Sequence, residues 1–141
     1  MDDHNTLEIG ETGEASFVAS DSDMASALSA EEPFPEVLAT SRMIALMELS
    51  AARLMKKTLE PNQLSVGVGV FVQHLAATPK NTEVRCVARF LGKEGKLFRF
   101  KVEAFDTAGK IGEGEHTRAI IDADRLVEGA RRRIDGRSTQ G

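Results

Sequence analysis

A small set of residues, spread over one predicted helix and two predicted strands, has the groups that nucleophilic and proton-transfer chemistry uses. Thr40 and Glu48 fall on the helix, Gly67 and His74 on a strand, and Arg118 on the last strand. A hydroxyl, a carboxylate and an imidazole attack carbonyl carbons and move protons at neutral pH. A glycine in a strand lets a ligand or another backbone approach closely. Each residue also has a structural explanation, so a shared function requires a fold that brings them together.

Glu48 interrupts the apolar face of a helix predicted for residues 40–57. Successive residues turn by about 100°, which places Ile44, Met47, Ala51 and Met55 on one face. That pattern is typical of a helix packed against a core. The residues three and four positions from Glu48 are all apolar, so no basic residue of the helix pairs with it. Glu48 is therefore either a structural acid bonded elsewhere or a functional one.

Residues 64–74 alternate between valines and other residues, which predicts a strand with one side cleared of bulk by Gly67 and Gly69. His74 ends this strand. A lone histidine at a strand end is more often a hydrogen-bonded structural residue than a catalytic one. In the same way, Arg118 is more often an ion-pair partner than a ligand clamp. These signals indicate a site only when they are taken together.

Several signatures of other chemistries are missing from the sequence. There is no phosphate-binding glycine motif at the start of a helix and no GxSxG motif. One cysteine and three scattered histidines do not have the spacing of a zinc site, so we expect no metal. The net charge of −4 and the absence of Trp and Tyr argue against a nucleic-acid partner.

The length of 141 residues, 41% of them hydrophobic, predicts one soluble domain spanning residues 1–141. We expect residues 1–13 and 135–141 to be poorly ordered. No apolar run approaches the roughly 20 residues of a membrane span, and the polar N-terminus is unlike a signal peptide. The single cysteine, Cys86, fits a reducing compartment and a place in the core. These features favour a cytoplasmic protein without a membrane partner.

The predicted elements follow the order strand, long helix, then four strands and a short last helix. The strands are predicted at residues 14–19, 64–74, 82–91, 96–106 and 111–122. Tight turns at 92–95 and 107–110 imply antiparallel neighbours, and a mostly apolar helix must be covered by the sheet. We therefore predict an α+β domain whose curved antiparallel sheet wraps around one long central helix. In the last helix we expect Leu126, Val127 and Ala130 to face inward.

The segment EEPFP (31–35) interrupts regular structure before the central helix. Its two prolines stiffen the backbone and remove hydrogen-bond donors. Phe34, which lies between them, either packs on the adjacent core or covers a pocket; packing is the default expectation.

Three blocks of the sequence carry a family resemblance: FPEVLATSRMIALMELSAARLM (34–55), VGVGVFVQHLAATP (66–79) and GEGEHTRAII (112–121). They resemble the fluoroacetyl-CoA thioesterase-like family of hotdog-fold proteins, and the similarity runs in order from about residue 10 to 130. The resemblance implies a homodimer, or a dimer of dimers, in which two sheets join and the acyl-CoA sites lie near the interface. It also implies hydrolysis of an acyl-CoA thioester to a carboxylate and free CoA. No separate cofactor is implied, because coenzyme A belongs to the substrate.

By motif position, the family's catalytic threonine, glutamate and histidine fall on Thr40, Glu48 and His74. The glycine near the thioester carbonyl falls on Gly67, the pocket arginine on Arg118 and the aromatic lid residue on Phe34. One position departs from the pattern. Members that select the fluorinated substrate carry a second aromatic three residues before the lid, and that position is Glu31 here. The resemblance thus implies short-acyl thioesterase chemistry, while the departure at Glu31 argues against fluoroacetyl selectivity.

The spacing of Thr40 and Glu48 limits how they act together. In one regular helix they lie ~12 Å apart along the axis, so a compact triad needs Thr40 at or before the helix start, or a bridge through water or His74. Two other functions fit the same fold. One is a non-catalytic module that binds acyl-CoA or another small ligand. The other, ranked lower, is an acyl-CoA hydratase, for which the expected Asp-plus-His arrangement is missing.

Overall fold

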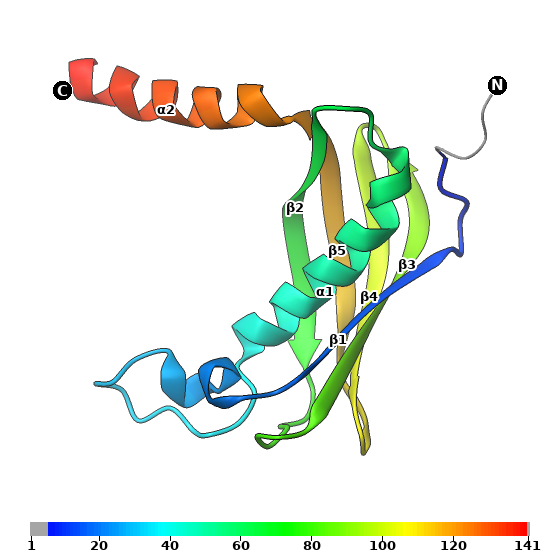
Figure 1. Ribbon diagram of the computed structural model, residues 1–141, viewed down its shortest axis with the longest axis vertical. Coiled ribbons are helices and arrows are strands. Elements are labelled where there is room, and N and C mark those ends of the chain that lie inside the picture. Colours follow the sequence, from blue (N-terminus) through cyan, green and yellow to red (C-terminus); the bar gives the residue numbers. More distant parts are fainter. Residues whose placement is uncertain (1–5, 141) are drawn as a thin grey trace.

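The computed structural model describes residues 6–140 as one antiparallel sheet curled around a helix (Figure 1). Helix α1 (Thr40–Met55) lies across the sheet, and helix α2 (Ala123–Gln140) extends away from it. The strands lie in the order β1-β3-β4-β5-β2, so β1 and β2 form the two edges. The predicted α+β fold with a curved sheet around one central helix is confirmed. The strands are β1 (Thr12–Val18), β2 (Gln63–His74), β3 (Glu83–Glu94), β4 (Leu97–Asp106) and β5 (Gly109–Asp122).

The core lies between α1 and the sheet. Met47, Ala51 and Met55 of the predicted apolar face are buried, whereas Ile44 is only partly so. They pack with sheet residues that are also buried, among them Val84, Cys86, Phe100 and Val102. Burial raises the pKa of the Cys86 thiol to about 12, so it stays protonated and unreactive at neutral pH.

A β-bulge interrupts the regular alternation that the sequence predicts for β2. Gly67 pairs with Arg118 of β5 and Gly69 with Thr117, so Val68 is an extra residue without a partner of its own. A bulge of this kind shifts all later residues of the strand by one position relative to its neighbour.

The bulge determines which side chains of β2 face α1. Residues seven apart in a regular strand point to opposite faces, but one inserted residue returns them to the same face. The backbone of Gly67 and the side chain of His74 both meet residues of α1, namely Glu48 and Thr40. The extra residue therefore places both Gly67 and the side chain of His74 on the concave face of the sheet.

The start of α1 is held by the segment before it. Asp23 is buried and accepts a bond of 2.8 Å from Arg42 Nε, and its backbone carbonyl accepts a bond of 2.9 Å from Ala39 N. Met24 and Leu38 form an isolated antiparallel bridge. These contacts fix the position of Thr40, the first residue of α1. Short 3₁₀ turns lie at Asp21–Asp23, Ala25–Ala27 and Lys56–Thr58.

The bounds of the first strand and the last helix differ from those predicted, while the expected poor order of residues 1–13 and 135–141 stays a prediction. Strand β1 begins at Thr12, and α2 continues to Gln140, beyond Asp135, where regular structure was expected to end. Residues 1–5 and 141 lie outside the described part. Leu126 and Val127 were expected to face inward, but they are 45% and 54% exposed, because α2 leaves the sheet instead of folding back on it. Within residues 6–140, no helix is long and apolar enough to cross a membrane.

Candidate active site

The structure brings two of the predicted catalytic residues into direct contact. Thr40 Oγ1 lies 2.8 Å from His74 Nδ1, although the residues are 34 positions apart. Thr40 opens α1 and His74 closes β2, so the contact forms where the helix start meets the strand end. If the hydroxyl donates to Nδ1, the imidazole takes up the proton when the oxygen attacks. The pair therefore has the geometry of a hydroxyl activated by a base.

The environment of His74 keeps its imidazole in the neutral form. Partial burial lowers the pKa of His74 below its ordinary 6.5, and the nearby backbone of Ala76 opposes this in part. Its Nε2 is buried and has no hydrogen-bond partner in the part of the chain that the structure describes. Thr40 and His74 line a pocket of about 330 Å³ together with residues of the segments 25–38 and 75–77.

Glu48 forms an ion pair with Arg118. Glu48 Oε2 lies 3.3 Å from Arg118 Nη1. The arginine side chain is only 7% exposed, whereas that of Glu48 is 44% exposed. The enclosed apolar position that the helix pattern predicts for Glu48 is therefore not found in the single chain. Its carboxylate lies at the rim of the concave face, with one side towards Arg118 and the other open.

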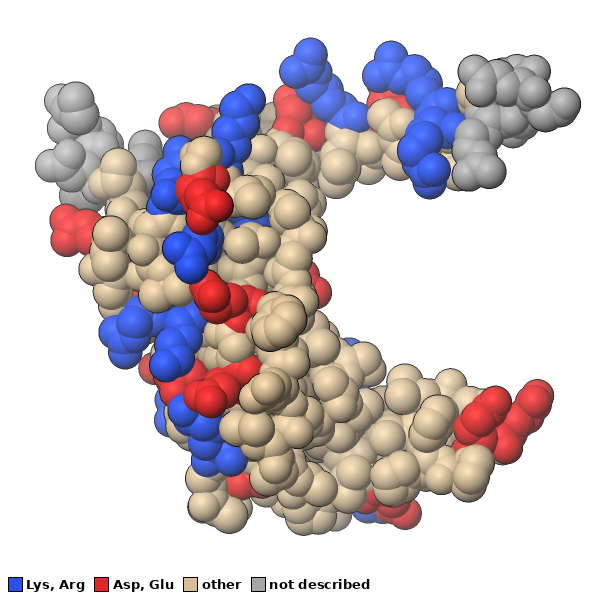
Figure 2. Space-filling view, turned by 180° about the vertical axis from the view of Figure 1, so that it is seen from behind, with Lys and Arg blue, Asp and Glu red and all other residues tan. Residues whose placement is uncertain are grey.

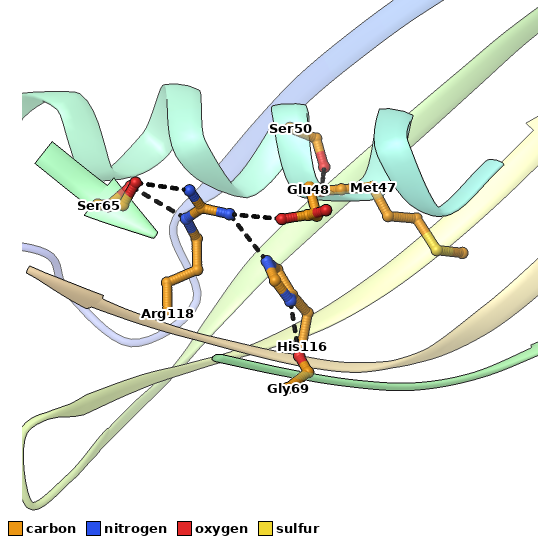
Figure 3. Close-up of polar contacts among 7 residues, drawn as sticks. All are labelled: Met47, Glu48, Ser50, Ser65, Gly69, His116 and Arg118. Carbon is orange, nitrogen blue, oxygen red and sulfur yellow. Dashed lines mark hydrogen bonds and ion pairs between the residues drawn. The ribbon is translucent and has the colours of Figure 1, made fainter. Parts of the chain in front are cut away.

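Arg118 is anchored by two residues that were not among the predicted site residues (Figure 3). Its Nε donates to Ser65 Oγ at 3.0 Å, and its Nη2 donates to the Ser65 carbonyl oxygen at 2.8 Å. Its Nη1 also lies 3.1 Å from His116 Nε2. Burial lowers the pKa of Arg118, and the charge of Glu48 opposes this. Because these contacts occupy its donors, Arg118 is better placed to orient Glu48 than to bind a charged group of a ligand.

His116 and Ser65 could have been found from strand periodicity. His116 shares the predicted face of β5 with Arg118, since the two are separated by one residue. Ser65 is two positions from Gly67 on β2, on the same face. The missing information was the register between β2 and β5, which no local pattern supplies.

Gly67 provides the space that Glu48 occupies. A Cβ atom added at Gly67 would lie 2.5 Å from Glu48 Oε2 and 3.3 Å from His116 Cε1. Any larger residue would push the carboxylate away from its place. The close approach that a glycine inside a strand indicates is thus made by the side chain of Glu48.

Phe34 lies on the segment that projects beyond the start of α1 (Figure 1). Its ring is 44% exposed, and its backbone N–H donates to the Glu32 carbonyl oxygen at 2.9 Å. It therefore does not plug the core of its own chain. The next residue, Pro35, lines the same pocket as His74, whereas Phe34 is not among the residues that line it.

The predicted site residues form two groups within one chain. Thr40 and His74 lie at one end of β2, and Glu48, Gly67 and Arg118 lie further along it. Gly67 and His74 are seven positions apart along the strand, or about 20 Å. No hydrogen bond or ion pair among the described residues links Glu48 to Thr40 or His74.

Comparison with known proteins decides the family. A family model described as fluoroacetyl-CoA-specific thioesterase matches residues 20–124, most of the chain. The chain belongs to this thioesterase family. The match includes both groups of site residues, whereas almost all of α2 lies beyond it.

Relatives of the thioesterase family share both its sequence and its fold. The fluoroacetyl-CoA thioesterase of Streptantibioticus cattleyicolor is 40% identical over 93 residues, which are 66% of this chain and 67% of that protein. A solved structure of the fluoroacetyl-CoA thioesterase FlK is 34% identical with a TM-score of 0.85, covering 90% of this chain and 97% of that one. A thioesterase superfamily member from Thermus thermophilus is 27% identical with the same TM-score, covering 96% and 98% of the two chains. The predicted hotdog fold and thioesterase class are confirmed.

The thioesterase site has no arrangement suited to a metal. Within residues 6–140, no group of three or more His, Cys, Asp or Glu side chains is placed to hold an ion. The groups on hand are a hydroxyl–imidazole pair and an oriented carboxylate. These suit nucleophilic attack and proton transfer on a carbonyl compound.

Proposed function

We propose that the protein hydrolyses the thioester of a small acyl-CoA, giving a carboxylate and free CoA, at a site built from two copies of the chain. Thr40 and His74 come from one copy and Glu48 from the other. We further propose that the chain is a single cytoplasmic domain and that no cofactor acts besides the CoA of the substrate.

The observation that carries this proposal is that each group of residues is incomplete alone. His74 Nε2 is buried without a partner, and the Glu48 carboxylate is 44% exposed beside a fixed arginine. A neutral imidazole that accepts a proton from Thr40 at Nδ1 carries its own proton at Nε2. A carboxylate is the acceptor that best stabilises this proton when the ring becomes charged. We propose that Glu48 of the partner subunit supplies it when the atoms that cover Nε2 in the single chain make room for the carboxylate.

Pairing of two β2 strands brings these groups together. Strand β2 is an edge of the sheet, and antiparallel pairing of two identical edges obeys a two-fold axis. An axis near Val70 places His74 of one strand opposite Val66 of the other. Gly67 and the carboxylate of Glu48 lie next to that position. Glu48 and the Thr40–His74 pair, which are about 20 Å apart within one chain, thereby lie close to each other across the two chains.

The surface around the β2 edge supports a second copy as its partner. Val68 and Val70 of the strand are 55% and 43% exposed, and Leu75, just after it, is 52% exposed. Helix α2 and the segment that carries Phe34 project on this side, and Figure 2 shows a hollow between them with few charged residues. An exposed apolar strand edge is usually covered in a soluble protein.

The chemistry follows from the groups assembled. An oxygen nucleophile attacks the thioester carbonyl carbon, His74 takes the proton from that oxygen, and the C–S bond breaks as the proton passes to the CoA sulfur. Two routes use the same residues: Thr40 is acylated and then released by water, or Thr40 orients a water that Glu48 and His74 deprotonate. In both, the backbone N–H near Gly67 polarises the carbonyl oxygen.

Solved relatives support a CoA thioester as substrate. Structures of FlK include a variant in complex with fluoroacetate and CoA and another in complex with acetyl-CoA. For this chain we propose a small acyl group without selectivity for fluorine, since Glu31, in place of a second aromatic residue, is an exposed carboxylate near Phe34.

Thiol release from a panel of acyl-CoAs tests the reaction. We expect free CoA from acetyl-CoA and fluoroacetyl-CoA with kcat/KM values within about tenfold of each other, and release lowered at least about 100-fold, to a small measurable residue, in Glu48→Gln and His74→Ala. Tight acyl-CoA binding without thiol release would instead identify a binding module. Consumption of an enoyl-CoA without thiol release would identify a hydratase.

Mixing two inactive variants tests the shared site. A heterodimer of Glu48→Gln and His74→Ala chains has one intact site, because the intact Glu48 and the intact His74 come from different chains. After unfolding and refolding of an equal mixture, about half of the dimers are mixed and about a quarter of the original activity returns. A site contained within one chain would give no recovery.

A further inference from the structure

The concave face contains a second histidine that the proposed mechanism does not use. His116 of β5 is 1% exposed, and its ring centroid lies 6.5 Å from that of Phe100 on β4. A fully buried imidazole needs hydrogen-bond partners at both nitrogens. The identity of those partners indicates what the ring does.

The first partner fixes the tautomer of His116. Its Nδ1 lies 2.8 Å from the carbonyl oxygen of Gly69, which only accepts hydrogen bonds. Nδ1 therefore carries a proton, and in the neutral ring Nε2 presents a lone pair. That lone pair faces Arg118 Nη1 at 3.1 Å. The carbonyl that sets the tautomer belongs to the bulge of β2.

The second partner places His116 in a chain of contacts that ends at Glu48. Arg118 Nη1 has two hydrogens, one directed at His116 Nε2 and the other at Glu48 Oε2, 3.3 Å away. Ser65 holds the remaining two nitrogens of the guanidinium. The plane of the guanidinium is thus fixed on one side by Ser65 and on the other by His116 (Figure 3).

The contact between His116 and Arg118 requires a neutral imidazole. A charged ring would carry a proton at Nε2 and direct it against the guanidinium. Burial lowers the pKa of His116, the Gly69 carbonyl opposes this, the charge of Arg118 lowers it further and that of Glu48 raises it. The groups that face the ring are therefore Arg118 on its own strand, Gly69 on β2, Glu48 on α1 and the apolar Phe100 on β4.

We propose that His116 is a positioning residue, whose Nε2 lone pair sets the direction in which Arg118 presents the second N–H of its Nη1 to Glu48. This inference rests on the proposed function, in which Glu48 completes the hydrolytic site. Without the lone pair the guanidinium can turn about its Ser65 anchor, and the carboxylate loses its fixed orientation.

Two substitutions of His116 test the roles of its two ring nitrogens separately. In His116→Gln, the amide oxygen reaches the place of Nε2 and accepts from Arg118, while the bond to Gly69 is lost. In His116→Asn, the amide nitrogen takes the place of Nδ1 and donates to Gly69, while the bond to Arg118 is lost. We expect His116→Gln to keep kcat within about threefold and His116→Asn to lower it about 10- to 100-fold, with KM nearly unchanged. Equal losses in both, or a loss in His116→Gln alone, would overturn the proposal.

A second substitution at Glu48 tests whether the effect passes through the carboxylate. In a Glu48→Gln background we expect His116→Asn to lower the residual kcat by less than about twofold, because residues that act as a unit are not additive. Independent, multiplicative losses would contradict a positioning role.

A measurement on the unmutated protein keeps the proposal testable if a variant does not fold or no thioester is hydrolysed. Ring ¹⁵N shifts of His116 should report a protonated Nδ1 and an unprotonated Nε2 at neutral pH. The opposite tautomer, or a charged ring, would overturn the proposal. Failure of the unmutated protein to release CoA would instead reject the proposed function and leave this tautomer assignment in place.

Discussion

Thr40 Oγ1 and His74 Nδ1 lie 2.8 Å apart at the junction between the start of α1 and the end of β2. Neither residue is rigid by itself, but each lies at one end of a helix or strand that other contacts hold in place. The bridge between Met24 and Leu38 fixes the start of the helix, and pairing of His74 with Gly112 fixes the end of the strand. Two separate anchors thus set the distance between the hydroxyl and the imidazole that we propose as nucleophile and base.

This contact predicts a clear difference between two substitutions of Thr40. Thr40→Ser keeps the hydroxyl and should retain at least about a tenth of kcat. Thr40→Val keeps the shape without the hydroxyl and should lower kcat at least about 100-fold. Because Thr40 is exposed, both should change the free energy of unfolding by less than about 0.5 kcal/mol. Steady-state thiol release and urea unfolding measure the two quantities, and an active Thr40→Val would exclude Thr40 from the reaction.

The histidines predict how stability changes with pH. Burial lowers the pKa of both His74 and His116 relative to the unfolded chain. Between each lowered pKa and 6.5, the unfolded state binds more protons than the folded state, so stability rises with pH there. The contribution is complete above pH 6.5 and is lost as pH falls towards the folded pKa values.

Urea unfolding between about pH 8 and pH 5 measures this dependence. We expect the free energy of unfolding to decrease below pH 6.5 and the slope to become smaller in His74→Gln. The acid limb of kcat/KM should also lie below that pH, since neutral His74 acts as the base. A stability that increases as the solution is acidified through this range would contradict the assigned direction.

Gly67→Ala should affect activity more than stability. The new methyl group would lie 2.5 Å from Glu48 Oε2, the end of a flexible and partly exposed side chain. The carboxylate can move aside, so we expect a change of less than about 1 kcal/mol in unfolding but a decrease of about 10- to 100-fold in kcat.

Gly129→Ala is the matched control for this substitution. Nothing lies within 4 Å of a Cβ atom at Gly129, which is in α2. Alanine there should leave kcat unchanged and stabilise the helix by up to about 1 kcal/mol. Full activity of Gly67→Ala would mean that the placement of Glu48 does not matter for turnover.

Val68→Lys should separate the two copies. A lysine on an exposed strand edge opposes pairing with another strand. We expect this variant to sediment as a monomer and to lose activity, since the shared site is then incomplete. Val18→Lys places the same charge on the opposite edge, at a valine that is 60% exposed on β1, and should remain dimeric and active. A monomer with full activity would refute the shared site.

The sequence predicts the fold better than the site, because the helix and strands depend on neighbouring residues whereas the site depends on residues far apart in the sequence. Helix α1 was recognised from the period of Met47, Ala51 and Met55, which are all buried. The strands were recognised from alternation and tight turns to within a few residues. Both patterns are local. The contact between His116 and Arg118 is partly local as well, but their partners Ser65 and Gly69 depend on the register between β2 and β5.

Glu48 and α2 mark the limits of local reasoning. The absence of a basic neighbour on α1 showed that Glu48 has no ion-pair partner in its own helix but did not name one elsewhere, and in the structure that partner is Arg118. The pattern did not reveal that the carboxylate stays partly open, because exposure depends on the curvature of the sheet. For α2, a stripe of Leu126 and Val127 was interpreted as inward-facing, but the helix leaves the sheet and has no surface to pack on.

The unpaired Val68 gives β2 a sensitivity to changes in chain length. Deletion of that single residue would preserve the hydrophobic composition of the strand, yet every side chain downstream would exchange sides. Gln73 would then turn towards the helix, and His74 would turn out to the convex surface. A substitution at Val68 leaves the facing of the later residues unchanged, whereas an insertion or deletion there reverses it. In this enzyme the number of residues between Gly67 and His74 matters as much as their identity.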